Sequence, residues 1–106
     1  MAKIARGSGN VFADLGYKDA EERQTKVRLA VAINRIVERR GLSQVGIAAL
    51  LGIGQPKVSA LSNFKLDGFS VERLMTFLTA LDRDVSIVIK RKPRSRSMGR
   101  ISVVAA

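Results

Sequence analysis

The chain has 106 residues, the size of one domain with a short tail, and 46% of them are hydrophobic, which is enough for a small core. It contains no histidine and no cysteine, which removes the commonest general base, the commonest zinc ligand and all disulfides, so an enzyme is not expected. The net charge of +10 favours an acidic partner, either nucleic acid or an anionic membrane.

The first 18 residues are expected to form an N-terminal arm and extension. Residues 1–10 are basic and end in small polar residues, which favours a flexible segment, and residues 11–17 are an apolar patch expected to pack on the domain. The chain has neither an apolar signal core near its start nor an apolar run of 18 residues. We therefore expect a cytoplasmic protein without a membrane span.

A long helix is predicted to begin after Asp19, its N-cap, and to end near Arg40, because Gly41 provides a C-terminal stop. Its apolar stripe consists of Leu29, Ile33, Ile36 and Val37.

Residues 43–63 predict two short helices joined by a tight turn. Ser43 is a favourable N-cap for the first helix, and the glycines at 52 and 54 break it and reverse the chain. Pro56 lies in the first turn of the second helix, where its missing N–H costs nothing. This is the pattern of a helix-turn-helix, and its second helix is the candidate DNA reader.

A further helix is predicted after Ser70, its cap, with a buried face made by Val71, Leu74, Met75, Leu78 and Leu81. Residues 85–89 then alternate with a period of two, which predicts a short strand. A strand needs a partner, and three segments could supply it: residues 101–104, the segment around Val11 and Phe12, or the same strand of a second subunit. The last arrangement would make a two-fold dimer.

Residues 91–106 are expected to be a basic, flexible tail. From residue 85 onward the chain carries six basic residues and no acid: Lys90, Arg91, Lys92, Arg94, Arg96 and Arg100. The tail is open to three interpretations: a solubility segment, an electrostatic anchor to DNA, or a toxin-binding segment.

The residues Ser43, Gln44, Ala48, Gly52, Ile53, Gln55, Pro56, Val58, Ser59 and Leu61 stand at spacings that resemble the lambda-repressor/Cro-like, or XRE-type, helix-turn-helix family. The flanking stretches N-V-F-A-D-L-G-Y and G-F-S-V-E-R-L-M-T-F-L-T-A-L-D-R-D-V resemble the branch that includes HigA-type antitoxins, which pair with a RelE-like toxin. The resemblance implies a mainly α fold over residues 19–90. It would be a lambda-repressor-like bundle of four to five helices with a short C-terminal β-strand.

Three residues depart from the family pattern. Gly46 lies inside the first motif helix, where glycine costs about 1 kcal/mol relative to a good helix former. Gly54 replaces the usual side-chain cap of the reader helix, at a cost of a few tenths of a kcal/mol. Phe64 stands where the family usually has glycine, which leaves the local backbone there open.

On a helical wheel Val58 and Leu61 define the buried side of the reader helix, so the opposite side is predicted to face DNA. The candidate base-reading residues are Gln55, Pro56, Lys57, Ser59 and Ala60. The candidate phosphate contacts are Ser43, Gln44, Lys65 and Arg73. The resemblance implies a phosphate contact for Asn63, and the same role for Gln44 and Lys65. The competing interpretation is that these are ordinary solvated side chains, which the motif context makes the less favoured one.

These features predict a sequence-specific, DNA-binding transcriptional regulator, a repressor and homodimer that binds double-stranded DNA. The alternative is an antitoxin that binds a RelE-like toxin and represses its own operon. A third, weaker hypothesis is non-specific binding of nucleic acid or anionic membrane through the basic tail. No cofactor motif and no metal-binding pattern is present in the sequence.

Overall fold

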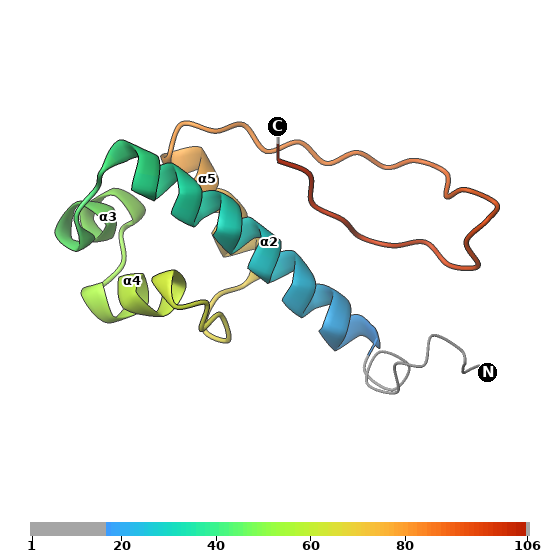
Figure 1. The fold of residues 1–106 in the computed structure, drawn as a ribbon, viewed down its shortest axis with the longest axis horizontal. Coiled ribbons are helices and arrows are strands. Elements are labelled where there is room, and N and C mark those ends of the chain that lie inside the picture. Colours follow the sequence, from blue (N-terminus) through green and yellow to red (C-terminus); the bar gives the residue numbers. More distant parts are fainter. Residues whose placement is uncertain (1–16, 106) are drawn as a thin grey trace.

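The computed structural model describes residues 17–105, which contain four α-helices: α2 (Tyr17–Arg40), α3 (Gln44–Leu51), α4 (Gln55–Ser62) and α5 (Val71–Ala80) (Figure 1). The mainly α, helix-turn-helix prediction is confirmed for this part of the chain. The arm and apolar patch predicted for residues 1–16 lie outside the described residues. No single helix between residues 17 and 105 is long and apolar enough to cross a membrane.

The first described helix, α2, begins earlier than predicted. It starts at Tyr17, so Asp19 lies within its first turn and is not the residue that precedes the helix. An acidic side chain there still stabilises the helix, because the N-terminal end of the helix dipole is positive. The end at Arg40 is as predicted, followed by Gly41 with a φ of 62°.

All four described helices end in the same backbone motif. In each, a residue with positive φ follows the helix end, and the next N–H group bonds the carbonyl oxygen five residues earlier. These bonds satisfy carbonyl groups that the helix leaves without partners. The residues with positive φ are Gly41, Gly52, Phe64 and Asp82.

The turn between α3 and α4 is the one the glycine pattern predicts. The Ser43 hydroxyl oxygen accepts the Gly46 N–H at 3.0 Å and caps α3, while Gly54 precedes α4 without a side-chain cap. The helix direction turns by 105° between α3 and α4, within the range typical of a helix-turn-helix.

The hydrophobic core lies where α2, α5 and the α3–α4 pair meet. Of the apolar face predicted for α5, Leu74, Leu78 and Leu81 are buried and the other members are half-buried. Leu66, Phe69 and Phe77, which the sequence pattern did not predict as core residues, are also buried. The rings of Phe69 and Phe77 meet edge to face with centroids 5.9 Å apart. The remaining buried apolar residues are Leu29, Ala30, Ile33, Ile36, Ile47, Leu51, Val58 and Leu61.

The prediction of a strand at residues 85–89 is wrong for the single chain, because no β-bridge forms anywhere in residues 17–105. Residues 83–105, here named the C-terminal arm, leave α5, run outward and double back (Figure 1). Period-two alternation predicts extended backbone, but a strand also needs a neighbour with which to exchange hydrogen bonds. Within the described residues no other segment pairs with 85–89.

The returning half of the arm contacts the helical body at two points. The Ile101 N–H donates to a Glu21 carboxylate oxygen at 3.0 Å, and Val103 is half-buried against the core. The arm therefore closes a wide loop whose two ends are both held by the helices.

Candidate nucleic-acid interface

The reader helix α4 is fixed to the domain from one side. Val58 and Leu61 are buried in the core, with exposed fractions of 1% and 2%. The Asn34 amide of α2 also donates to the Leu61 carbonyl oxygen at 3.2 Å. Asn34 was not identified from the sequence, although a lone polar residue beside the apolar stripe of α2 is a signal of such a contact.

The N-terminal end of α4 is open to solvent. Gln55 and Pro56 are the first two helical residues and both are exposed. With nothing in the described residues bonded to its side-chain amide, Gln55 remains available to a base edge. Its position matches the major-groove contact expected of a reader helix.

Lys57 is placed differently from the sequence expectation. Its side chain is half-buried, and its ammonium donates to the Gly68 carbonyl oxygen at 3.1 Å. The same nitrogen lies 5.0 Å from the centroid of the Phe69 ring, within cation–π distance. In this arrangement Lys57 links α4 to the loop before α5.

The remaining base-reading candidates, Ser59 and Ala60, are also partly covered by other residues of the domain. Ser59 and Ala60 are half-buried, and Ala60 packs against the core, so the wheel placed it too far outward. The reason is that α4 touches the rest of the domain along a wider strip than Val58 and Leu61 alone define. The Asn63 side-chain amide donates to the Ser59 carbonyl oxygen at 2.9 Å and lies 3.5 Å from its hydroxyl oxygen.

The phosphate candidates come from three elements. Ser43 and Gln44 are exposed at the start of α3, Lys65 is exposed after α4, and Arg73 is exposed in the first turn of α5. The guanidinium carbon of Arg73 lies 5.6 Å from the centroid of the Phe77 ring. Because no acidic residue occurs between Glu38 and Asp67, the segment with the α3–α4 pair carries no charge that would repel phosphate.

Phe64 keeps the backbone that glycine would give. Its φ is 58°, and the N–H groups of Phe64 and Lys65 bond the carbonyl oxygens of Leu61 and Ala60 at 3.2 and 2.9 Å. The helix end at Asn63 is therefore closed normally, although a non-glycine residue in the left-handed region costs about 1–2 kcal/mol. The Phe64 side chain remains 44% exposed beside the reader helix.

The described residues contain no cluster of three or more metal-ligating acidic, histidine or cysteine side chains. The exposed first turn of α4, Gln55 and Pro56, is the part of this surface that can approach a base edge.

Comparison with known proteins supports this geometry. A family described as a helix-turn-helix domain matches residues 11–90. A solved structure named "Putative XRE Family Transcriptional Regulator" is 70% identical in sequence, with a TM-score of 0.80, over 83% of this chain and 99% of that one. The search of curated proteins gave no match. Since the family match spans most of the chain and the solved relative is aligned over nearly its whole length, this chain belongs to the helix-turn-helix family of the XRE type.

Proposed function

We propose that this protein is a sequence-specific, DNA-binding transcriptional regulator that reads the major groove with α4. The observation that carries the proposal is the α3–α4 pair at 105°, with the N-terminal end of α4 exposed and its opposite side fixed in the core. A reader helix must be held rigidly while its first residues remain free, and α4 meets both conditions.

Gln55 is the residue best placed to read a base. A glutamine amide pairs with adenine through two hydrogen bonds, while Pro56 offers apolar surface to a thymine methyl group. Ser59 and Ala60 would add contacts deeper in the helix. Lys57 would reach guanine only after its ammonium leaves the Gly68 carbonyl oxygen, so we assign it first to positioning α4.

Phosphate contacts would orient the domain on the duplex without reading its sequence. We assign them to Ser43 and Gln44 at the start of α3, to Asn63 and Lys65 at the end of α4, and to Arg73. The N-terminus of α3 adds unpaired N–H groups and a positive dipole end. The regulator would act as a homodimer, because one short reading surface gives limited specificity and two half-sites give more. We propose that it acts in the cytoplasm and represses transcription.

Selection of bound sequences from a random duplex pool, followed by fluorescence anisotropy at physiological salt, tests the proposal. We expect a preferred sequence with two-fold symmetry that binds at least about 10³-fold more tightly than random DNA. A ratio near one would show that binding is electrostatic only, through the basic residues of the arm.

An antitoxin is the alternative function. It is supported by the resemblance in the flanking stretches and by the exposed apolar side chains of the C-terminal arm, a surface that a protein partner would cover. Co-expression with the product of the adjacent gene, followed by a pulldown and a growth assay, separates the two functions. A toxic neighbour that the chain binds and neutralises identifies an antitoxin, whereas a harmless neighbour that does not bind eliminates it.

A further inference from the structure

The C-terminal arm exposes an unusual amount of apolar surface. Most of the exposed large apolar side chains in residues 19–105 belong to it: Val85, Ile87, Val88, Ile89, Met98, Ile101 and Val104. Ile87, Val88 and Ile89 are 75%, 77% and 93% exposed and consecutive. Single exposed apolar residues are common, but a continuous group of them marks an interaction site.

The same segment has an extended backbone without partners. In the described part of the chain no backbone hydrogen bond holds residues 84–92, and no β-bridge includes them. An extended segment of alternating apolar residues with free N–H and carbonyl groups is a template for strand pairing.

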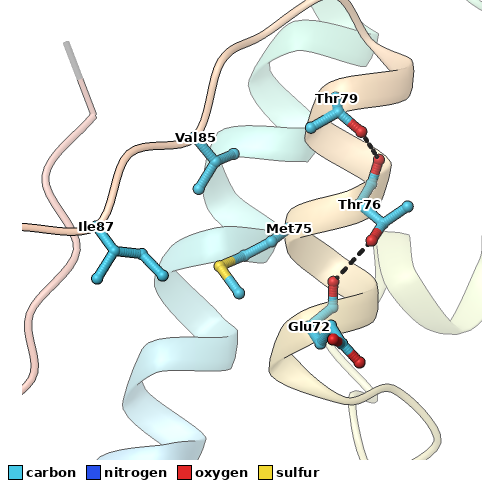
Figure 2. Close-up of a pocket in the computed structure, with 6 residues that line it drawn as sticks. All are labelled: Glu72, Met75, Thr76, Thr79, Val85 and Ile87. Carbon is cyan, nitrogen blue, oxygen red and sulfur yellow. Dashed lines mark hydrogen bonds between the residues drawn. The ribbon is translucent and has the colours of Figure 1, made fainter.

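A shallow groove lies between this segment and α5. Its volume is about 230 Å³, and it is lined by Glu72, Met75, Thr76, Thr79, Val85 and Ile87. Figure 2 shows Val85 and Ile87 on the arm facing α5, with Met75 directed toward them from α5. The apolar groove therefore lies directly beside the unpaired backbone of the arm.

We propose that residues 85–89 pair antiparallel with the same residues of a second copy of this chain, about a two-fold axis at Ile87. In this register Ile87 faces Ile87 of the second copy, and Val85 faces Ile89 of the second copy, all on one side of the ribbon. The partner's Ile89 then lies over the groove beside Met75.

Charge supports this register. On the other side of the ribbon, Asp84 faces the second copy's Lys90. Opposite charges directly across a strand pair are favourable. Arg83 and the second copy's Arg91 are a like-charged pair, which occurs once at each end of the ribbon, outside residues 85–89.

Neighbouring symmetric registers are poorer. An axis at Ser86 places Asp84 opposite Val88 of the second copy, and an axis at Val88 places Val85 opposite Arg91 of the second copy. In a two-fold antiparallel pair, facing residues must point to the same side of the sheet. The axis can therefore pass only through a residue, and neighbouring registers differ by moving it one residue along the chain. Only the Ile87 register gives each of Val85, Ile87 and Ile89 an apolar residue of the second copy as its opposite neighbour.

This inference rests on the homodimer of the proposed function and names its surface. In Figure 1 the arm and α4 lie on opposite sides of α2, so pairing through the arm leaves the reader helices free.

The chain lacks cysteine, so single cysteine variants test the interface directly. We expect Ile87→Cys to form a covalent dimer under mild oxidation, because its two copies face each other. Val88→Cys is the matched control: it is equally exposed, but its two copies would be too far apart for a disulfide. Val45→Cys on α3, 63% exposed, controls for random collision.

A second pair of variants tests whether Ile89 of one copy packs over the groove of the other, with the fold of the single chain expected to stay unchanged. Ile89→Asp should convert the dimer to a monomer at micromolar concentration in analytical ultracentrifugation, with unchanged helical circular dichroism. Val104→Asp, on the same arm and 88% exposed, should remain a dimer.

The outcomes separate the two levels of the proposal. If the wild-type chain is a monomer, both the homodimer and this interface are wrong. If it is a dimer but Ile87→Cys does not cross-link, the dimer remains and this surface is wrong. Faster cross-linking of Val88→Cys overturns the register. A monomer whose amides at 85–89 resist hydrogen exchange would identify an intrachain partner, such as the segment at Val11 and Phe12, and would also overturn the proposal.

Discussion

Lys57 and Phe69 are in direct contact: the Lys57 ammonium lies 5.0 Å from the centroid of the Phe69 ring while it donates to the neighbouring Gly68 carbonyl oxygen at 3.1 Å. Phe69 in turn is buried and meets Phe77 of α5 edge to face. A residue that the motif assigns to base reading thus links the reader helix to the loop that anchors α5. Its effects on DNA binding and on stability must be measured separately.

Lys57→Ala should lower the free energy of unfolding by about 1 kcal/mol, because it removes one charge-assisted hydrogen bond and one cation–π contact at a half-buried site. Urea denaturation measures this change. Lys65→Ala is the control, since Lys65 is exposed; it should leave stability unchanged and reduce the salt slope of DNA binding by about one unit. An unchanged stability in Lys57→Ala would mean that the contact with Gly68 has no energetic weight.

Gln55→Ala should weaken binding to the selected DNA sequence by about 1–3 kcal/mol and relax the preference at one base pair. Its stability should change by less than about 0.5 kcal/mol, because the side chain is exposed. Anisotropy titrations against the selected sequence and its single-base variants give both quantities. Ser62→Ala, exposed at the other end of α4, should bind as the wild type does, and equal losses in both variants would refute the assignment of Gln55.

Asn34→Ala should destabilise the protein by about 1 kcal/mol, because it removes the hydrogen bond between α2 and the Leu61 carbonyl oxygen. It should also weaken specific DNA binding, since this bond helps to orient α4. Thermal and urea unfolding measure the first effect, and anisotropy measures the second. Arg35→Ala, exposed on the same helix, is expected to be neutral for stability; a loss as large as that of Asn34→Ala would indicate a general effect on α2.

At position 64 glycine should be more stable than alanine by about 1 kcal/mol, because both variants lose the phenyl ring and only alanine retains the strain of a φ of 58°. At Ser62, inside α4, the order should reverse, since glycine in a helix is less stable than alanine by about 0.5–1 kcal/mol. Urea midpoints of the four variants test both statements. The same order at both positions would contradict a left-handed backbone at residue 64.

The sequence by itself determined the order and type of the helices between residues 43 and 81. Ser43, Gly52 and Ser70 act through neighbours a few residues away, so their capping and turn roles can be recognised from local pattern. The family resemblance rests on the same local residues, and the comparisons confirmed it at the level of the XRE type.

Strand pairing and the burial of loop residues were decided by the tertiary structure, because both depend on contacts between residues distant in sequence. Whether residues 85–89 form a strand depends on a partner, and no described segment of the chain supplies one. The burial of Leu66 and Phe69 depends on how the loop before α5 folds over the core.

The reader helix shows the same division between local pattern and three-dimensional contacts. A helical wheel assigns Lys57 and Ala60 to directions around one axis, but it cannot show that the Gly68 carbonyl oxygen or the core lies in those directions. Gln55 and Pro56 remained exposed as predicted, because the first turn of a helix has few neighbours to cover it. The direction of a side chain follows from the helix alone. Whether that side chain is free or already held by another group depends on contacts between residues distant in sequence.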